Sequence, residues 1–125
     1  MKQNLVAWFE IPVSDMDRAR SFYEKVFNIE IGVENFNGIL MGFFPFVKDG
    51  PGAMGSLIQQ ESYIPSKEGV LIYFNSEDVQ TELDRVVHAG GSIYQEKTMI
   101  SPDHGYMGAF IDTEGNRIAL YCNSK

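Results

Sequence analysis

The sequence predicts an α+β domain made of two tandem β-α-β-β-β modules. Each half of the chain has an apolar strand-like run, then an amphipathic helical segment, then three more strand-like runs. The 125 residues, 44% hydrophobic and 22% charged, suit one globular domain covering residues 1–125, with modules of about 1–62 and 63–125. We expect the modules to form a cup-shaped, mostly antiparallel sheet with the helices outside, because each sheet has one face that a helix must cover.

The first half begins with an apolar and aromatic run, residues 5–13, that predicts a strand. Ser14 is a favourable N-cap for the helix that follows. The apolar face of this helix has residues at helical spacing, namely Ala19, Phe22, Tyr23, Val26 and Phe27. Three further strands are expected at residues 29–34, 39–47 and 55–60. Asn37-Gly38 predicts a hairpin turn between the first two of them.

The second half repeats this order, starting with a buried-type strand at residues 69–74. Ser76 is the expected N-cap of the second helix, and Gly90 supplies a left-handed C-cap. The apolar face of this helix consists of Val79, Leu83, Val86 and Val87. The last three strands are expected at residues 92–97, 105–112 and 117–122.

Charge and cysteine content exclude some classes of partner. The net charge of −7 argues against nucleic acid and anionic membranes, since both select basic patches. Cys122 is the single cysteine, which fits a reducing compartment. We expect no signal peptide, because the first residues lead straight into strand-like sequence, and no apolar run is long enough to span a bilayer. We therefore expect a cytoplasmic protein with no membrane partner.

Three segments resemble signatures of a known superfamily. They are residues 9–15 with the following Arg18 and Phe22-Tyr23, residues 79–91, and residues 112–118 with the sequence Asp-Thr-Glu-Gly-Asn-Arg-Ile. Together they resemble the vicinal oxygen chelate superfamily, which includes glyoxalase I, bleomycin-resistance proteins and extradiol dioxygenases. The resemblance covers nearly the whole chain. It implies the fold and a ligand site inside the cup, but not one reaction, because the superfamily hosts many chemistries.

The resemblance also implies where metal ligands would lie in this chain. The metal enzymes of the superfamily use histidine or glutamine on the first and fifth strands and carboxylates on the fourth and eighth. Those positions fall on Trp8, Leu71 and Ala119, with the fourth-strand position near Ser56 or Leu57, or on Gln59 in another register. Trp8, Leu71 and Ala119 cannot bind a divalent ion. The two histidines, His88 in the last helical turn and His104 in a loop, do not replace them. We therefore expect no metal and no cofactor.

Two residues are candidates for acid–base chemistry. Glu10 lies two residues after Trp8, so both side chains are expected on the same face of the first strand. A carboxylate in an apolar cup could act as a general acid or base, whereas the alternative is a structural carboxylate paired with arginine or tyrosine. His104 could be a mobile acid or base over the mouth of the cup, or a loop histidine without a role.

The remaining candidates are expected to bind substrate. Tyr73, Arg117 and Tyr121 have the parity of the metal-ligand positions on their strands and could line the cup. Arg117 could pair with an anionic ligand, or it could be a surface arginine at the start of a strand. Both tyrosines could equally be half-buried core residues. Trp8 offers a flat surface for an aromatic ligand, against the alternative of core packing.

These residues favour a glyoxalase- or bleomycin-resistance-like protein that binds a small molecule in the cup without metal-dependent chemistry. The expected ligand is a small apolar or aromatic metabolite. One alternative is a metal-independent isomerase or lyase that uses Glu10 with Tyr73 or His104. Another is a protein-interaction module with a filled cup. The apolar stretch of residues 43–46 and the uncovered strand edges predict a homodimer.

Overall fold

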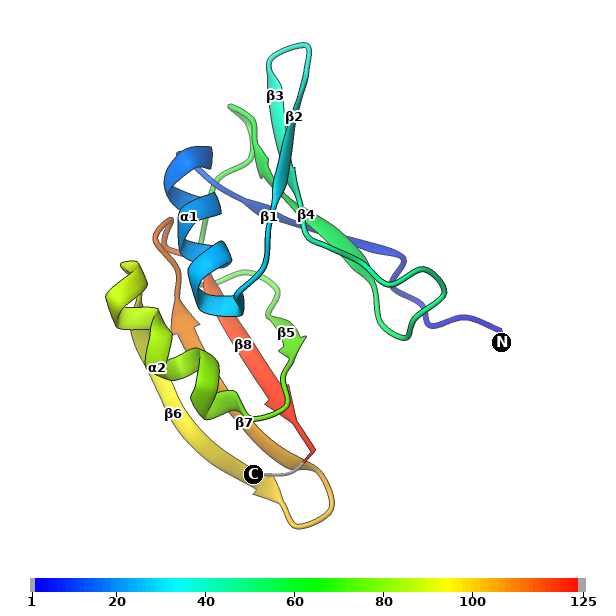
Figure 1. Cartoon of the computed structure of the whole chain (residues 1–125), viewed down its shortest axis with the longest axis vertical. Helices are drawn as coiled ribbons and strands as arrows, with labels where there is room; N and C mark the ends of the chain where they lie inside the picture. Colours follow the sequence, from blue (N-terminus) through cyan, green and yellow to red (C-terminus); the bar gives the residue numbers. More distant parts are fainter. Residues whose placement is uncertain (1, 124–125) are drawn as a thin grey trace.

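Two modules with the same element order follow one another along the chain in the computed structural model, which describes residues 2–123 (Figure 1). The first module contains β1 (Trp8–Pro12), α1 (Met16–Phe27), β2 (Gly32–Phe36), β3 (Ile39–Phe43) and β4 (Met54–Gln59). The second contains β5 (Ile72–Asn75), α2 (Val79–Ala89), β6 (Ser92–Ser101), β7 (Gly105–Ile111) and β8 (Arg117–Cys122). The predicted α+β class and the repeated β-α-β-β-β order are confirmed.

Each module has its own four-stranded sheet. The strand orders are β1-β4-β3-β2, here called sheet A, and β5-β8-β7-β6, here called sheet B. In each sheet the first and last strands of the module pair in parallel, and the other neighbours are antiparallel. The sheets are therefore mostly antiparallel, as predicted. Within residues 2–123 the strands form two sheets rather than one continuous sheet.

The N-caps of α1 and α2 lie one and two residues later, respectively, than predicted. Asp15, not Ser14, caps α1, and its side chain accepts a hydrogen bond from the backbone N–H of Arg18. Asp78, not Ser76, caps α2, and it accepts from the backbone N–H of Gln80. A carboxylate at this position also interacts favourably with the positive end of the helix dipole, which a serine hydroxyl does less well. The predicted left-handed C-cap at Gly90 is confirmed.

Pairing partners decide where the strands begin and end. β1 begins at Trp8 rather than at residue 5, because its first partner on β4 is Met54. β6 continues to Ser101, four residues beyond the prediction, because it pairs with β7 along most of that length through three register shifts. No helix in residues 2–123 is long and apolar enough to cross a membrane.

One hydrophobic core joins the two modules. Helices α1 and α2 contact each other, and each also packs against its own sheet (Figure 1). Aromatic rings from both modules meet in this core, namely Phe22, Tyr23, Phe27, Phe44, Phe74 and Phe110. Cys122 is buried in the same core. The modules are thus held together through their helix-covered faces.

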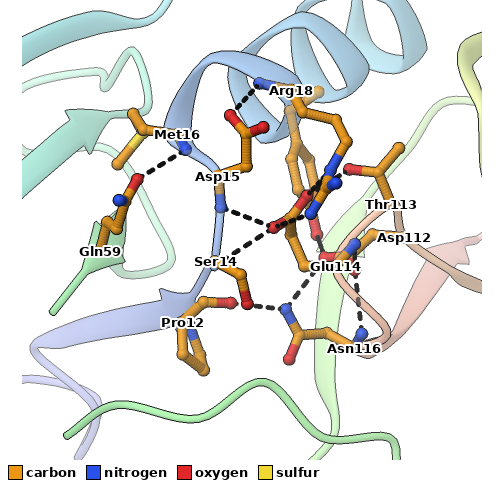
Figure 2. Close-up of polar contacts among 11 residues, drawn as sticks. Pro12, Ser14, Asp15, Met16, Arg18, Gln59, Asp112, Thr113, Glu114 and Asn116 are labelled. Atoms are coloured by element: carbon orange, nitrogen blue, oxygen red, sulfur yellow. Dashed lines mark hydrogen bonds and ion pairs between the residues drawn. The ribbon is translucent and has the colours of Figure 1, made fainter. Parts of the chain in front are cut away.

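The turn between β7 and β8 forms a polar junction with the start of α1 (Figure 2). The carboxylate of Glu114 accepts hydrogen bonds from the backbone N–H groups of Ser14 and Asp15, at 2.8 and 2.9 Å. It also pairs with the guanidinium of Arg18 at 2.8 Å. Asn116 donates from its side chain to the carbonyl of Pro12 at 2.7 Å. The second module therefore supplies acceptors and donors to the first.

A buried hydrogen bond between Tyr23 and Asp112 stabilises this junction. The hydroxyl of Tyr23 donates to the carboxylate of Asp112 at 2.6 Å. Burial, together with the charge of Asp112, raises the pKa of Tyr23 well above its ordinary value, so the hydroxyl stays protonated and remains a donor. Asp112 also accepts from the backbone N–H groups of Glu114 and Asn116, which fixes the shape of the turn.

Glu114 is held in its charged form. Burial by itself raises the pKa of this carboxyl, but hydrogen bonds from Arg18, Thr113 and the backbone of Ser14 and Asp15 outweigh it. The net pKa of Glu114 lies below its ordinary value of 4.5. A lowered folded-state pKa gives stability that is present above the unfolded-state pKa and is lost as the pH falls through the folded-state pKa.

We predict that Glu114→Gln lowers the free energy of unfolding by about 2 kcal/mol at neutral pH, because hydrogen bonds to a charged group contribute about that much. The gap between wild type and variant should shrink as the pH falls below 4.5 toward the folded-state pKa. Urea unfolding measured at several pH values tests this. Glu77→Gln is the matched control, since Glu77 is exposed and should show neither effect. A constant gap at all pH values would contradict the prediction.

Candidate functional site on the open faces of the sheets

Each sheet has one face covered by helices and one face turned away from them, here called the open face. In sheet A, Phe9 and Ile11 of β1 belong to the core, so the alternating residues Trp8 and Glu10 lie on the open face. In sheet B, Ile118 and Leu120 of β8 belong to the core. The alternating residues of β8 lie on the open face, namely Arg117, Ala119 and Tyr121. The candidate binding residues therefore occupy the open faces.

The open face of sheet A carries a row of aromatic side chains. Trp8 contacts the edge of Phe43, with ring centroids 6.2 Å apart, and Phe43 contacts Phe36 at 6.4 Å. Trp8 is 40% exposed, so it is not a core residue within this chain. A hollow of about 560 Å³ lies beside it, and its lining includes Phe43, Phe46 and Met54. This hollow has the size and apolar character of a small-molecule site.

A second hollow, of about 410 Å³, lies between the modules. Phe9, Phe27 and Phe44 form its apolar wall, and residues 71–75 at the edge of sheet B form the other side. Tyr73 is among these residues and is half exposed. The structure thus places Trp8 and Tyr73 at two different hollows.

The open face of sheet B carries the remaining predicted binding residues. Tyr73 of β5 pairs in register with Ala119 of β8, so both lie on the same face as Arg117 and Tyr121. Tyr121 donates to the side chain of Asn123 at 2.7 Å. The guanidinium of Arg117 lies over the ring of Tyr94, 5.4 Å from its centroid. Tyr73, Arg117 and Tyr121 are therefore brought onto one surface.

The two predicted acid–base residues lie on different elements. Glu10 is exposed on β1, in register with Ser56 of β4. His104 lies in the turn between β6 and β7, where its Nδ1 is 2.7 Å from the hydroxyl of Ser101. Within residues 2–123 no hydrogen bond joins Glu10 to His104 or to Tyr73.

The residues at the positions of the superfamily's metal ligands do not fit a metal ion. Trp8, Leu71 and Ala119 carry no donor atom for a metal, and Ser56 offers one neutral hydroxyl. Gln59 lies on the other face of β4, where its side-chain oxygen accepts from the backbone N–H of Met16. The part of the chain that the structure describes has no group of three or more His, Cys, Asp or Glu residues able to hold a metal.

Two features of the open faces were not predicted. Ser56 is fully buried, and its hydroxyl has no hydrogen-bond partner among the described residues. Its register opposite Glu10 could have indicated its face, but not its missing partner. Tyr94 lies at a register shift between Ile93 and Gln95. Simple alternation does not predict the side on which a bulged residue lies, so its contact with Arg117 could not be predicted from the sequence.

Comparison with known proteins identifies the protein family to which this chain belongs. The family model described as the Glyoxalase/Bleomycin resistance protein/Dioxygenase superfamily matches residues 5–120. The chain belongs to this superfamily. A glyoxylase-like domain-containing protein from Didymella fabae is 27% identical over 122 residues, which cover 92% of this chain and 91% of that protein.

Solved structures share the fold at low sequence identity. A glyoxalase/bleomycin resistance protein from Albidiferax ferrireducens T118 superimposes with a TM-score of 0.73 at 16% identity, covering 98% of this chain and 99% of that one. TnmS3, an antibiotic binding protein from Streptomyces sp. CB03234, gives 0.65 at 22% identity and 99% coverage of both chains. Glyoxalase I from Zea mays gives 0.69 at 16% identity, covering 94% of this chain. This chain spans only 45% of the length of that enzyme.

Proposed function

We propose that this protein binds a small apolar or aromatic molecule on the open face of sheet A and performs no metal-dependent chemistry. The observation that carries the proposal is the aromatic hollow beside Trp8, at the position where metal enzymes of the superfamily have a ligand. A flat ring favours stacking with an apolar or aromatic molecule, and the indole offers a metal ion no ligand atom; the one charged residue in the lining is the exposed Glu34. The antibiotic-binding relative supports small-molecule binding as a function of this fold.

The surroundings of the acid–base candidates give less support to the alternative of a metal-independent isomerase or lyase. Glu10 is exposed, and His104 is hydrogen-bonded within its own turn. The alternative of a protein-interaction module needs a filled site, while the hollow beside Trp8 is open. Cys122, a single buried thiol, supports a cytoplasmic location, because a reducing compartment favours free cysteines.

The absence of metal chemistry is tested by elemental analysis of protein purified without chelator. We expect far less than one equivalent of zinc, nickel, iron or manganese per chain, because three of the four ligand positions lack a donor atom. Protein incubated with excess zinc and then desalted serves as the control for weak surface binding. One tightly held metal ion per chain would overturn this part of the proposal.

Binding beside Trp8 is tested with 2-naphthamide, a neutral aromatic probe. Trp8 is the only tryptophan, so its indole N–H gives a single resonance in a ¹⁵N-labelled sample. We expect the probe to shift this resonance, and Trp8→Ala to weaken binding by about 2- to 12-fold, which corresponds to the loss of 0.5–1.5 kcal/mol of stacking.

Tyr63→Ala is the matched control for this experiment. Tyr63 lies between β4 and β5 and is 41% exposed, close to the 40% of Trp8, but it does not line the hollow. The control variant should bind the probe like the wild type. If bound probe leaves the indole resonance unchanged and Trp8→Ala unfolds the protein, then Trp8 has only a packing role.

We further propose that the protein is a homodimer. Large apolar side chains outside the lining of this hollow are also exposed in the first module, among them Leu5, Phe36 and Val47. An apolar surface of this kind is typical of a face that a partner covers.

Light scattering coupled to size exclusion at micromolar concentration should give twice the 14.1 kDa of one chain. Val47→Glu should shift the equilibrium toward monomer, because it places a charge on the apolar surface outside the hollow. Val87→Glu, at an exposed position on α2, should not. A monomeric wild type would refute the homodimer.

A further inference from the structure

Arg117 differs from the other three arginines in its partners. Arg18 pairs with Glu114, Arg20 pairs with Glu24, and Arg85 donates to the carbonyl of Val26. Arg117 has no carboxylate within 4 Å among the described residues, although the chain has 17 acidic residues against 10 basic ones. Its polar contact is with the hydroxyl of Tyr94, at 3.5 Å from Nη1. The Nε of Arg117 is buried and has no hydrogen-bond partner.

An unpartnered buried N–H of a guanidinium is costly, because the group loses its hydration and gains nothing in return. Native proteins rarely leave such a donor without a partner, and an exception calls for an explanation. Only two buried side-chain polar atoms lack a partner in residues 2–123, namely Nε of Arg117 and the hydroxyl of Ser56. Strand alternation places both residues on open faces. The unpartnered hydroxyl of Ser56 thus lies on the face of sheet A where the ligand is proposed, and the unpartnered Nε of Arg117 lies on the open face of sheet B.

The surroundings of Arg117 define the chemistry that would satisfy it. Tyr94 covers the guanidinium and is itself 54% exposed, so the pair lies at the surface of the open face. Ala119, on the same face of β8, and Ala109, its partner on β7, have small side chains and are themselves buried. The larger neighbours of these two alanines on the open face are Tyr73, Tyr121, Ile111 and Met107. One permanent positive charge thus stands among aromatic and apolar groups.

We propose that Arg117 and Tyr94 form a recognition point for a carboxylate carried by an aromatic ligand. Nε and Nη2 of a guanidinium form a planar fork that matches the two oxygens of a carboxylate, and the Nη1 side of Arg117 already faces Tyr94. The aromatic part of the ligand contacts the tyrosine rings around the guanidinium. This inference rests on the proposed small-molecule function and extends it to the open face of sheet B, outside the hollow beside Trp8, where the charge of the ligand would be recognised.

The test compares 2-naphthoate with 2-naphthamide, which have nearly the same shape but differ in charge at neutral pH. Titration calorimetry should show that wild-type protein binds the acid at least about tenfold more tightly than the amide, the size expected for one charge-assisted pair. Arg117→Gln should remove this preference and leave amide binding unchanged. Arg117→Lys should retain only part of it, because it keeps the charge but not the fork.

Arg20→Gln is the matched control, because it removes the same charge from the exposed side of α1. It should keep the full preference for the acid, and thermal unfolding of each variant checks that it is folded. Equal binding of both probes to the wild type would overturn this inference and leave the proposed function standing. A preference that survives Arg117→Gln would also overturn it. If neither probe binds the wild type, the proposed function fails and the inference fails with it.

Discussion

The carboxylate of Glu114 at the start of α1 is the contact on which the arrangement of the modules depends. It comes from the β7–β8 turn of the second module and accepts two backbone N–H groups that the helix itself cannot satisfy. Arg18 neutralises its charge, and Tyr23 fixes the same turn through Asp112. These four groups of the first module, together with the carbonyl of Pro12, thus have hydrogen-bond partners in the second module. Apolar and aromatic residues of both modules also pack together in one core.

Docking the modules through their helix-covered faces has a consequence for function. The core and the junction use one face of each sheet, and both open faces remain free of contact with helices. The side chains on the open faces are therefore not needed for the core within this chain. Trp8, Tyr73 and Tyr94 all remain about half exposed, although aromatic residues of this size are usually more buried. A surface built in this way is available for a ligand or a second chain.

The two open faces differ in chemistry. Sheet A presents Trp8, Phe43 and Phe36 in contact with one another, a surface without positive charge. Sheet B presents one guanidinium among tyrosines. Apolar area supplies most of the binding free energy of a small molecule, and a few placed polar groups supply its orientation. In the function proposed here, sheet A would supply apolar contact and sheet B a charged group, and neither role uses a metal ion at the positions of Trp8, Leu71 and Ala119.

The sequence by itself determined the class, the order of the elements and the faces of the strands. Apolar spacing identifies α1 and α2, and alternation along β8 places Arg117 and Tyr121 opposite Ile118 and Leu120, because these patterns are local. From the sequence alone, Glu114 is expected to be an ordinary turn residue, because its partners Ser14, Asp15 and Arg18 lie about 100 residues away in the chain. The contact of Tyr94 with Arg117 depends on a register shift in β6. Only the tertiary structure decided the contacts of Glu114 and of Tyr94. The packing of the modules and of the strands, and not any local pattern, sets which distant side chains meet.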